Sequence, residues 1–161
     1  MVNPLPLDPT EILIQHIKMI LNIDLNYEDF VKKISCDFSK RTGRIKNFKI
    51  NNILFATLRK EGAIVLTMYG AKMLINYNNS IENCVIPNEE IIPFIMEGRS
   101  LFCKHVKWCG SNIKIGSEVI VIDDKKKVIA IGKAVCPVEL MKKYHKGVAV
   151  KIREGLKSRE G

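Results

Sequence analysis

The stretch EVIVIDDKKKVIAIGKAV, residues 118–135, decides the fold of this chain. Its first part, residues 118–123, is apolar almost without interruption, which predicts a buried strand. The charged segment 123–127 predicts a turn, and residues 128–135 predict a second apolar strand that pairs back on the first. The spacing of apolar residues and the turn residues also divide the rest of the sequence into strands, helices and turns.

More strands and short helices surround the hairpin from residue 88 onward. Residues 88–98 predict a short helix that ends at Gly98, a residue type that commonly follows the last helical turn. Residues 100–108 alternate in polarity, which predicts a strand. Residues 137–147 predict another short helix, and residues 148–155 predict the final strand.

The first part of the chain predicts a separate unit. The spacing of apolar residues predicts helices at 10–23 and 26–38, and Asn51–Asn52 are the turn of a predicted hairpin. The other elements expected here are strands at 44–50, 53–59, 63–67 and 82–87 and a helix at 68–77. The predicted fold class is therefore α+β, with a small α+β domain at residues 1–87 and a second domain of strands and short helices at residues 88–161.

Charge is distributed unevenly along the chain. The formal net charge is +9, and residues 98–161 hold 15 Lys and Arg against 6 Asp and Glu, whereas residues 1–97 hold 11 of each. Like charges gathered in one region repel each other, and a polyanionic partner relieves that repulsion. The alternative is a lysine-rich solvated surface in an AT-biased or heat-adapted proteome.

We infer the cellular compartment from three features that the sequence lacks, namely a membrane span, a secretory signal and a disulfide pattern. No apolar run approaches the roughly 18 to 20 residues of a membrane span. The N-terminal segment lacks the basic and then apolar order of a secretory signal. The 5 cysteines form no CxxC pair, which favours reduced thiols over a disulfide framework. We therefore expect a cytoplasmic protein with no membrane contact.

The order of elements after residue 88 resembles a PUA domain, a family named after pseudouridine synthases and archaeosine transglycosylases. The most specific pieces are residues 116–120, the segment AIGKAV at 130–135 and the segment KGVAVKIREG at 146–155. The resemblance implies that residues 88–161 form a small mixed β-barrel domain whose usual activity is RNA binding.

Residues 39–75 extend the resemblance. They are similar to the domain that precedes the PUA domain in archaeal tRNA-guanine transglycosylases and archaeosine synthases, where a TGRI segment opens a strand, a hairpin ends in an AT-x-R motif and a G-A-K helix follows. The transglycosylase barrel with its catalytic aspartates is absent from this sequence. The Pro-Cys motif of the synthase is absent as well, since the local order here is Cys136 and then Pro137.

The stretch GRSLFCKHVKWCG, residues 98–110, raises the question of a metal or redox site. Zinc needs three or four thiolate or imidazole ligands. Cys103 and His105 would share one face of a strand, but Cys109 would lie beyond its end. A fourth ligand would have to be Cys136 or His145. We prefer the interpretation in which Cys103 belongs to the core, and we expect no metal and no cofactor.

Predicted RNA contacts follow partly from the resemblance and partly from the residues. In the PUA family the loop after the first helix and the last strand line the RNA site, which corresponds here to Gly98, Arg99, Ser100, Lys151 and Arg153. A glycine lets the backbone approach a phosphate closely, and an arginine can hold one with two hydrogen bonds. Neighbouring cations complete the predicted surface: Lys104, Lys107, Lys142, Lys143, His145 and Lys146.

Two aromatic residues lie among these cations. Tyr144 and Trp108 could stack on unpaired bases. The alternatives are that Tyr144 packs in the core and that Trp108 covers the mouth of the barrel.

The sequence offers no catalytic residues. No glycine-rich phosphate loop is present, and carboxylates are sparse where the cations concentrate. The favoured function is a non-catalytic RNA-binding protein. The resemblance implies structured RNA as the ligand, namely tRNA near the acceptor end. It also implies a role as a module or subunit for a tRNA-modifying enzyme of the archaeosine pathway, a step that rests on analogy between domains. The alternative is a protein-interaction or ribosome-associated adaptor, which would dock through an apolar patch on residues 10–35. An enzyme with an unrecognised site would require a deep polar pocket.

Overall fold

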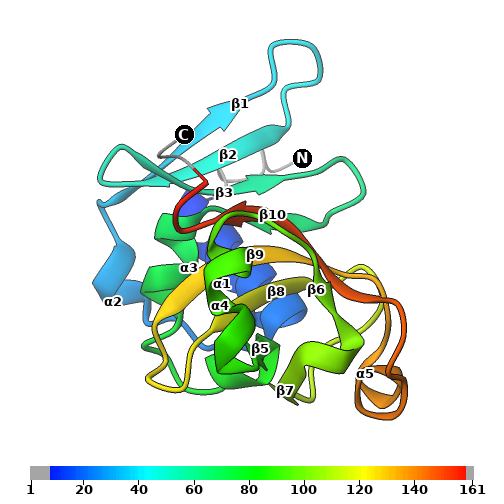
Figure 1. The fold of residues 1–161 in the computed structure, drawn as a ribbon. Coiled ribbons are helices and arrows are strands. Elements are labelled where there is room, and N and C mark those ends of the chain that lie inside the picture. Colours follow the sequence, from blue (N-terminus) through cyan, green and yellow to red (C-terminus); the bar gives the residue numbers. More distant parts are fainter. Residues whose placement is uncertain (1–7, 159–161) are drawn as a thin grey trace, which may run out of the picture.

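The computed structural model describes residues 8–158. Two β-sheets with short helices packed around them make up this part of the chain (Figure 1). One sheet has four strands in the order β1-β2-β3-β4, and the other has six in the order β6-β10-β9-β8-β5-β7. The α+β class is thereby confirmed. No helix of the described residues is long and apolar enough to cross a membrane.

The N-terminal unit is an antiparallel meander with helices against it. Its elements are α1 (Pro9–Leu21), α2 (Tyr27–Phe30), β1 (Ile34–Phe38), β2 (Ile45–Ile50), β3 (Ile53–Leu58), β4 (Ile64–Leu66), α3 (Met68–Leu74) and η1 (Ser80–Asn83). Asp8 caps α1 by accepting a hydrogen bond from the Thr10 amide. Asn51 and Asn52 have φ of 52° and 66°, which is the left-handed pair that a tight hairpin turn needs.

The second unit is a nearly closed, mixed barrel. Its elements are β5 (Cys84–Pro87), η2 (Glu89–Ile91), α4 (Ile92–Met96), β6 (Leu101–Phe102), η3 (Cys103–His105), β7 (Val106–Cys109), β8 (Glu118–Ile122), β9 (Val128–Ala134), α5 (Val138–Lys143) and β10 (Val148–Gly155). Strands β5 and β8 run parallel, and every other pair of neighbours is antiparallel. The sheet is mixed, as the family resemblance implied.

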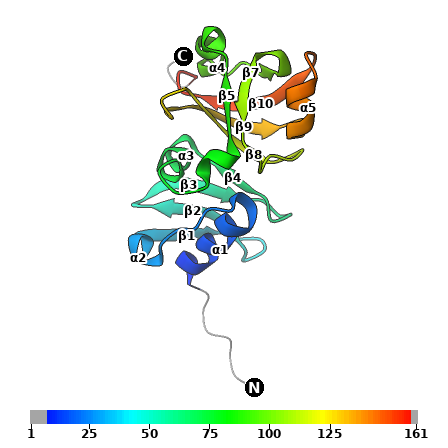
Figure 2. The same ribbon diagram turned by 90° about the horizontal axis from the view of Figure 1, so that it is seen from below.

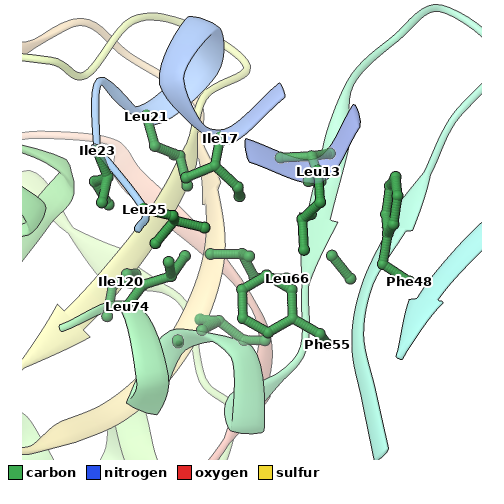
Figure 3. Close-up of a cluster of buried hydrophobic side chains, with 14 of the residues drawn as sticks. Leu13, Ile17, Leu21, Ile23, Leu25, Phe48, Phe55, Leu66, Leu74 and Ile120 are labelled. Carbon is green, nitrogen blue, oxygen red and sulfur yellow. The ribbon is translucent and has the colours of Figure 1, made fainter. Parts of the chain in front are cut away.

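Strand β8 is buried on both faces, which explains why its sequence does not alternate. Val119 and Val121 belong to the core inside the barrel. Ile120 and Ile122 belong to a second core that includes Leu13 of α1, and Figure 3 shows Ile120 among the side chains of the N-terminal unit. Each fully buried isoleucine contributes about 1.5–3 kcal/mol. The hairpin of residues 118–135 therefore joins the two units through an apolar interface.

The helix predicted for residues 26–38 is largely wrong. Helix α2 begins after its cap Asn26, as expected, but it ends at Phe30. Val31 is already extended, and Lys32 has a φ of 71°, so the chain turns away from the helix. The rest of the segment is β1, which pairs with β2 along its whole length. This pairing overrides the helical spacing of the apolar residues.

The single strand predicted for residues 100–108 is wrong as well. Strand β6 pairs with β10, strand β7 pairs with β5, and the one-turn helix η3 separates them. The amide of Cys103 donates to the Gly147 carbonyl, and the carbonyl of His105 accepts from the Asn88 amide. Because β6 and β7 lie at opposite ends of the sheet order, η3 carries the chain across the gap and brings the barrel close to closure.

Residues 82–87 do not close the N-terminal unit. They contain β5, which pairs with β7 and β8 of the six-stranded sheet. The expected boundary between residues 87 and 88 therefore falls directly after a strand of the barrel. Strand pairing alone places Cys84 and the residues after it with the second unit.

Candidate nucleic-acid interface

A pocket lies where η3, β7 and α5 meet, and four of the cationic or imidazole residues predicted from the sequence line it. Its cavity volume is about 260 Å³. The lining residues are Cys103, Lys104, Val106, Lys107, Trp108, Cys109, Met141, Lys142 and His145. We call this feature the α5 pocket. Folding thus joins two segments that are more than thirty residues apart in the chain into one basic hollow.

The Trp108 indole forms part of the pocket wall. Trp108 lies opposite Ile86 in the β5–β7 pair, and 39% of its surface remains exposed. An indole that is partly packed and partly open offers a rigid face on which an unpaired base can stack. Tyr144 is more exposed, at 57%, but it lies outside the lining of the α5 pocket.

The positive charge of the α5 pocket is only partly neutralised. The Lys107 ammonium lies 3.0 Å from a carboxylate oxygen of Asp124, and both side chains are 54% exposed. An exposed pair of this kind is weak and exchanges easily for another anion. No carboxylate of residues 8–158 lies within ion-pair distance of Lys104, Lys142 or His145.

Three thiols lie at or next to the pocket, since Cys103 and Cys109 line it and Cys136 contacts Cys103. The sulfur atoms of Cys103 and Cys136 are 3.7 Å apart, and both residues are free cysteines. Burial, together with the hydrogen bond to Cys103, raises the pKa of Cys136 to about 12. Burial also raises the pKa of Cys109. No group of three or more His, Cys, Asp or Glu residues between positions 8 and 158 is arranged to hold a metal ion.

The loop at Gly98 ends helix α4 in the way the sequence predicted. Gly98 has a φ of 97°, its amide donates to the Ile95 carbonyl, and the Arg99 amide donates to the Phe94 carbonyl. The Arg99 guanidinium lies 5.3 Å from the centre of the Phe94 ring, and its Nε is 3.8 Å from a Glu97 carboxylate oxygen. With 69% of its side chain exposed, Arg99 remains accessible to an anion.

The two residues predicted on the last strand differ in their surroundings. Lys151 is exposed and stands opposite Lys133 of β9. The guanidinium of Arg153 donates to both carboxylate oxygens of Glu118, at 2.7 Å each, and to the Leu66 carbonyl at 2.8 Å. Its terminal nitrogens are thus occupied within the protein. The RNA contact that the sequence analysis expects at Arg153 stays a prediction.

The predicted residues therefore fall into separate groups. Lys104, Lys107, Lys142 and His145 line the α5 pocket, whereas Lys143 and Lys146 are exposed beside it without lining it. Gly98, Arg99 and Ser100 form the loop after α4. The sequence reasoning overlooked Glu118, which holds Arg153. The signal was available, because Glu118 is the one carboxylate in an otherwise apolar strand.

The arrangement of the second unit is that of a small mixed β-barrel domain with a basic pocket on its surface. In particular, residues 84–156 match the family model of the PUA domain, so the chain contains a PUA domain. PUA domains bind RNA.

Similar sequences come from archaeal tRNA-guanine(15) transglycosylases. The protein from Thermoplasma volcanium is 32% identical over 146 residues, which cover 88% of this chain and 23% of the relative. The protein from Methanobrevibacter smithii is 31% identical over 129 residues, which cover 80% of this chain and 20% of the relative. The chain thus spans about a fifth of the length of the relatives that it matches.

Solved structures share the fold over almost the whole chain. A hypothetical protein from Pyrococcus horikoshii has a TM-score of 0.67 at 20% identity, over 95% of this chain and 93% of the other. A conserved PUA domain protein from Thermoplasma acidophilum has a TM-score of 0.60 at 18% identity, over 90% and 87%. At these identities the similarity concerns the fold alone.

Proposed function

We propose that the chain is a non-catalytic RNA-binding protein that holds structured RNA, namely tRNA near its acceptor end, at the α5 pocket. The observation that carries the proposal is the convergence of Lys104, Lys107, Lys142 and His145 on one hollow beside Trp108. Ammonium groups attract phosphates, and an exposed indole face accepts an unpaired base. A chain end with unpaired nucleotides offers both groups at once.

The choice of tRNA rests on the relatives. The two described above are named tRNA-guanine(15) transglycosylases, and this chain is similar to only about a fifth of their length. We infer that the chain supplies the RNA-binding part of such a system, as a module or subunit that works with a tRNA-modifying enzyme of the archaeosine pathway. Analogy between domains supports this step.

The adaptor alternative depends on an apolar patch over residues 10–35. Leu13, Ile17, Leu21 and Phe30 are all buried in the core. Among the large apolar side chains of that range, Met19 alone is strongly exposed, at 84%. Single exposed apolar residues are ordinary on protein surfaces. Residues 10–35 therefore form no exposed apolar patch through which an adaptor could dock.

The single tryptophan of the chain makes a direct test possible. Because Trp108 lines the α5 pocket, RNA bound there should change the intrinsic fluorescence of the protein. We expect total tRNA to change the emission in a saturable way, with an affinity that falls steeply as salt increases. A titration of the full chain at several salt concentrations measures both effects.

Variants show whether the α5 pocket is the site. We expect Lys104→Gln with Lys142→Gln to lower the affinity for tRNA about tenfold, as charge-assisted contacts are lost. The matched control is Lys33→Gln with Lys72→Gln, which removes the same charge from exposed positions of the N-terminal unit. Equal affinities of the two double variants, or saturating tRNA without a fluorescence change, would refute binding at the pocket.

A further inference from the structure

A second basic surface lies within residues 1–97, which hold equal numbers of cationic and anionic residues. Residues 38–60 hold 7 Lys and Arg and no Asp or Glu. The acidic residues that balance them lie elsewhere in the first 97 positions. A count over the whole segment therefore hides a strong local excess of positive charge.

Sheet topology gathers this charge at one end of the four-stranded sheet. The loop after β1 and the loop after β3 are both hairpin turns of the same antiparallel meander, so they emerge at the same end. Strands β2 and β3 are neighbours, with Asn47 opposite Thr57. Figure 1 shows the β1–β2 hairpin extending well beyond the helices that pack on the sheet.

Between these hairpins and the first turns of α1 lies an open groove of about 1580 Å³. We call it the hairpin groove. Its cationic residues are Lys40, Arg41, Arg44, Lys46, Arg59 and Lys60. Ile12, Phe38, Ile45 and Leu58 are the large apolar residues in its lining. The side chain of Phe38 is unusually open for an aromatic residue, with 58% exposure.

The groove cations form no ion pair with the residues that the structure describes, although Lys46 is close enough to Asp37 to help lower the pKa of that carboxyl group. None of the 5 ion pairs formed by residues 8–158 involves any of the six. Asp37 is the carboxylate in the groove lining, but it is already held by Lys49 at 3.0 Å and by the Asn47 amide at 3.4 Å. An external anion can therefore bind without displacing an internal one.

The size and the lining indicate what kind of anion fits. Small-molecule sites usually measure about 300–1,000 Å³ and are largely enclosed, so an open groove of 1580 Å³ suits a polymer. Repeated cations around an exposed aromatic ring match a chain that alternates phosphates with flat bases. An acidic peptide would satisfy the cations but would leave Phe38 without a stacking partner.

We propose that the hairpin groove is a second RNA-binding site, which holds a different segment of the RNA that the PUA domain binds. The inference rests on the proposed function, since it adds a contact to the same ligand. The hairpin tips lie at the upper right of Figure 1 and α5 at the lower right, and Figure 2 shows them on different units, so an RNA that contacts both sites must extend across the two units. Two linked contacts bind more tightly than either contact alone.

Three charge-matched sets of variants of the full chain test the proposal. The groove set is Arg41→Gln, Arg44→Gln and Arg59→Gln. The pocket set is Lys104→Gln, Lys107→Gln and Lys142→Gln. The control set is Lys33→Gln, Lys72→Gln and Lys114→Gln, which are exposed and line neither site. Thermal denaturation confirms that each set is folded, and filter binding of total tRNA at several salt concentrations gives the affinities.

We expect the groove set to bind tRNA at least tenfold more weakly than the control set, with a salt slope reduced by about 2 to 3. Phe38→Ser alone should weaken binding of single-stranded RNA severalfold through lost stacking. Groove and control sets with equal affinities would overturn the second site. If only the pocket set then lost binding, the proposed function would still stand.

A competition experiment separates RNA from a protein partner. Poly-glutamate of matched charge should displace tRNA from the wild-type chain poorly, because it offers nothing to stack on Phe38. If poly-glutamate bound as tightly as RNA, and if this binding were lost in the groove set, the groove would be a docking site for an acidic protein segment and the RNA proposal would fail.

Discussion

The guanidinium of Arg153 on β10 and the carboxylate of Glu118 on β8 form a bidentate ion pair, with both N–O distances at 2.7 Å. Glu118 also accepts from the Leu66 amide at 2.9 Å, while Arg153 donates to the Leu66 carbonyl. Leu66 belongs to β4 of the N-terminal sheet. One polar cluster therefore fastens the edge of the first sheet to two strands of the barrel.

Breaking this pair should destabilise the protein. Glu118 is only 8% exposed, so Arg153→Met leaves a buried carboxylate without its partner and should lower the free energy of unfolding by about 3 kcal/mol. Urea denaturation measures the change. The matched variant Arg99→Met removes an exposed arginine and should change stability by less than about 0.5 kcal/mol.

The double variant Arg153→Met with Glu118→Leu provides a further check. Because no charge is left buried, it should be more stable than Arg153→Met alone. If both arginine variants were equally stable, the pair would have no structural role, and Arg153 would again be free for the RNA contact predicted from the sequence.

Stacking on Trp108 should contribute measurably to RNA affinity. Trp108→Ala should weaken binding of tRNA with an intact unpaired 3′ end by about 1–3 kcal/mol, and Trp108→Phe should retain most of the affinity, because a phenyl ring still stacks. Tyr144→Ala is the comparison, since Tyr144 is exposed but does not line the α5 pocket. Calorimetric titration can rank the three variants, and a larger loss in Tyr144→Ala than in Trp108→Ala would contradict this assignment.

The sequence predicted local features of the fold well. The hairpin at Asn51–Asn52 and the glycine that ends α4 are each determined by a few neighbouring residues. The predictions for residues 26–38 and 100–108 were wrong because strands distant in the sequence determine the conformation of these segments. Strand β1 exists because it pairs with β2, and the break at η3 exists because β6 and β7 pair with different strands.

Fewer features of the candidate site than of the fold could be predicted from the sequence. The cations of the α5 pocket were identified because they cluster in the C-terminal part of the chain. The partner of Arg153 lies 35 residues away, and Leu66 lies 87 residues away, so neither contact leaves a local pattern. The hairpin groove was overlooked because charge was summed over 97 residues, which averaged out the basic segment 38–60.

Alkylation should reveal that the buried thiol of Cys84 and the half-buried thiol of Cys136 are protonated. Burial raises the pKa of Cys84 to about 12, and the pKa of Cys136 is raised to the same value. At pH 8 an ordinary cysteine is about one quarter thiolate, whereas a thiol with a pKa near 12 is about one part in ten thousand. We expect iodoacetamide to label both residues at least a hundredfold more slowly in the folded protein than in urea, as measured by mass spectrometry of the peptides.

The pH dependence of stability follows from the same shifts. A thiol whose pKa is raised by folding holds its proton in the folded state after the unfolded chain has lost it, so stability falls as pH rises from about 9 toward 12. Cys84→Ala should reduce this alkaline decline relative to the wild type. An unchanged decline in Cys84→Ala would mean that lysine and tyrosine titration accounts for it.

Replacement of Gly98 should separate a backbone effect from an RNA effect. Gly98 has a φ of 97° and Gly116 has a φ of 89°, so Gly98→Ala and Gly116→Ala should each cost about 1–2 kcal/mol of stability. The added methyl group meets only a side-chain atom 3.7 Å away at either position, so the strain is comparable. Gly98→Ala should also displace Arg99 and weaken tRNA binding by about 1.5–3 kcal/mol, the contribution of a hydrogen bond to a charged group. Gly116→Ala should bind tRNA like the wild type. If the two variants lost equal affinity, the loss would reflect stability, and the loop of residues 98–100 would not contact RNA.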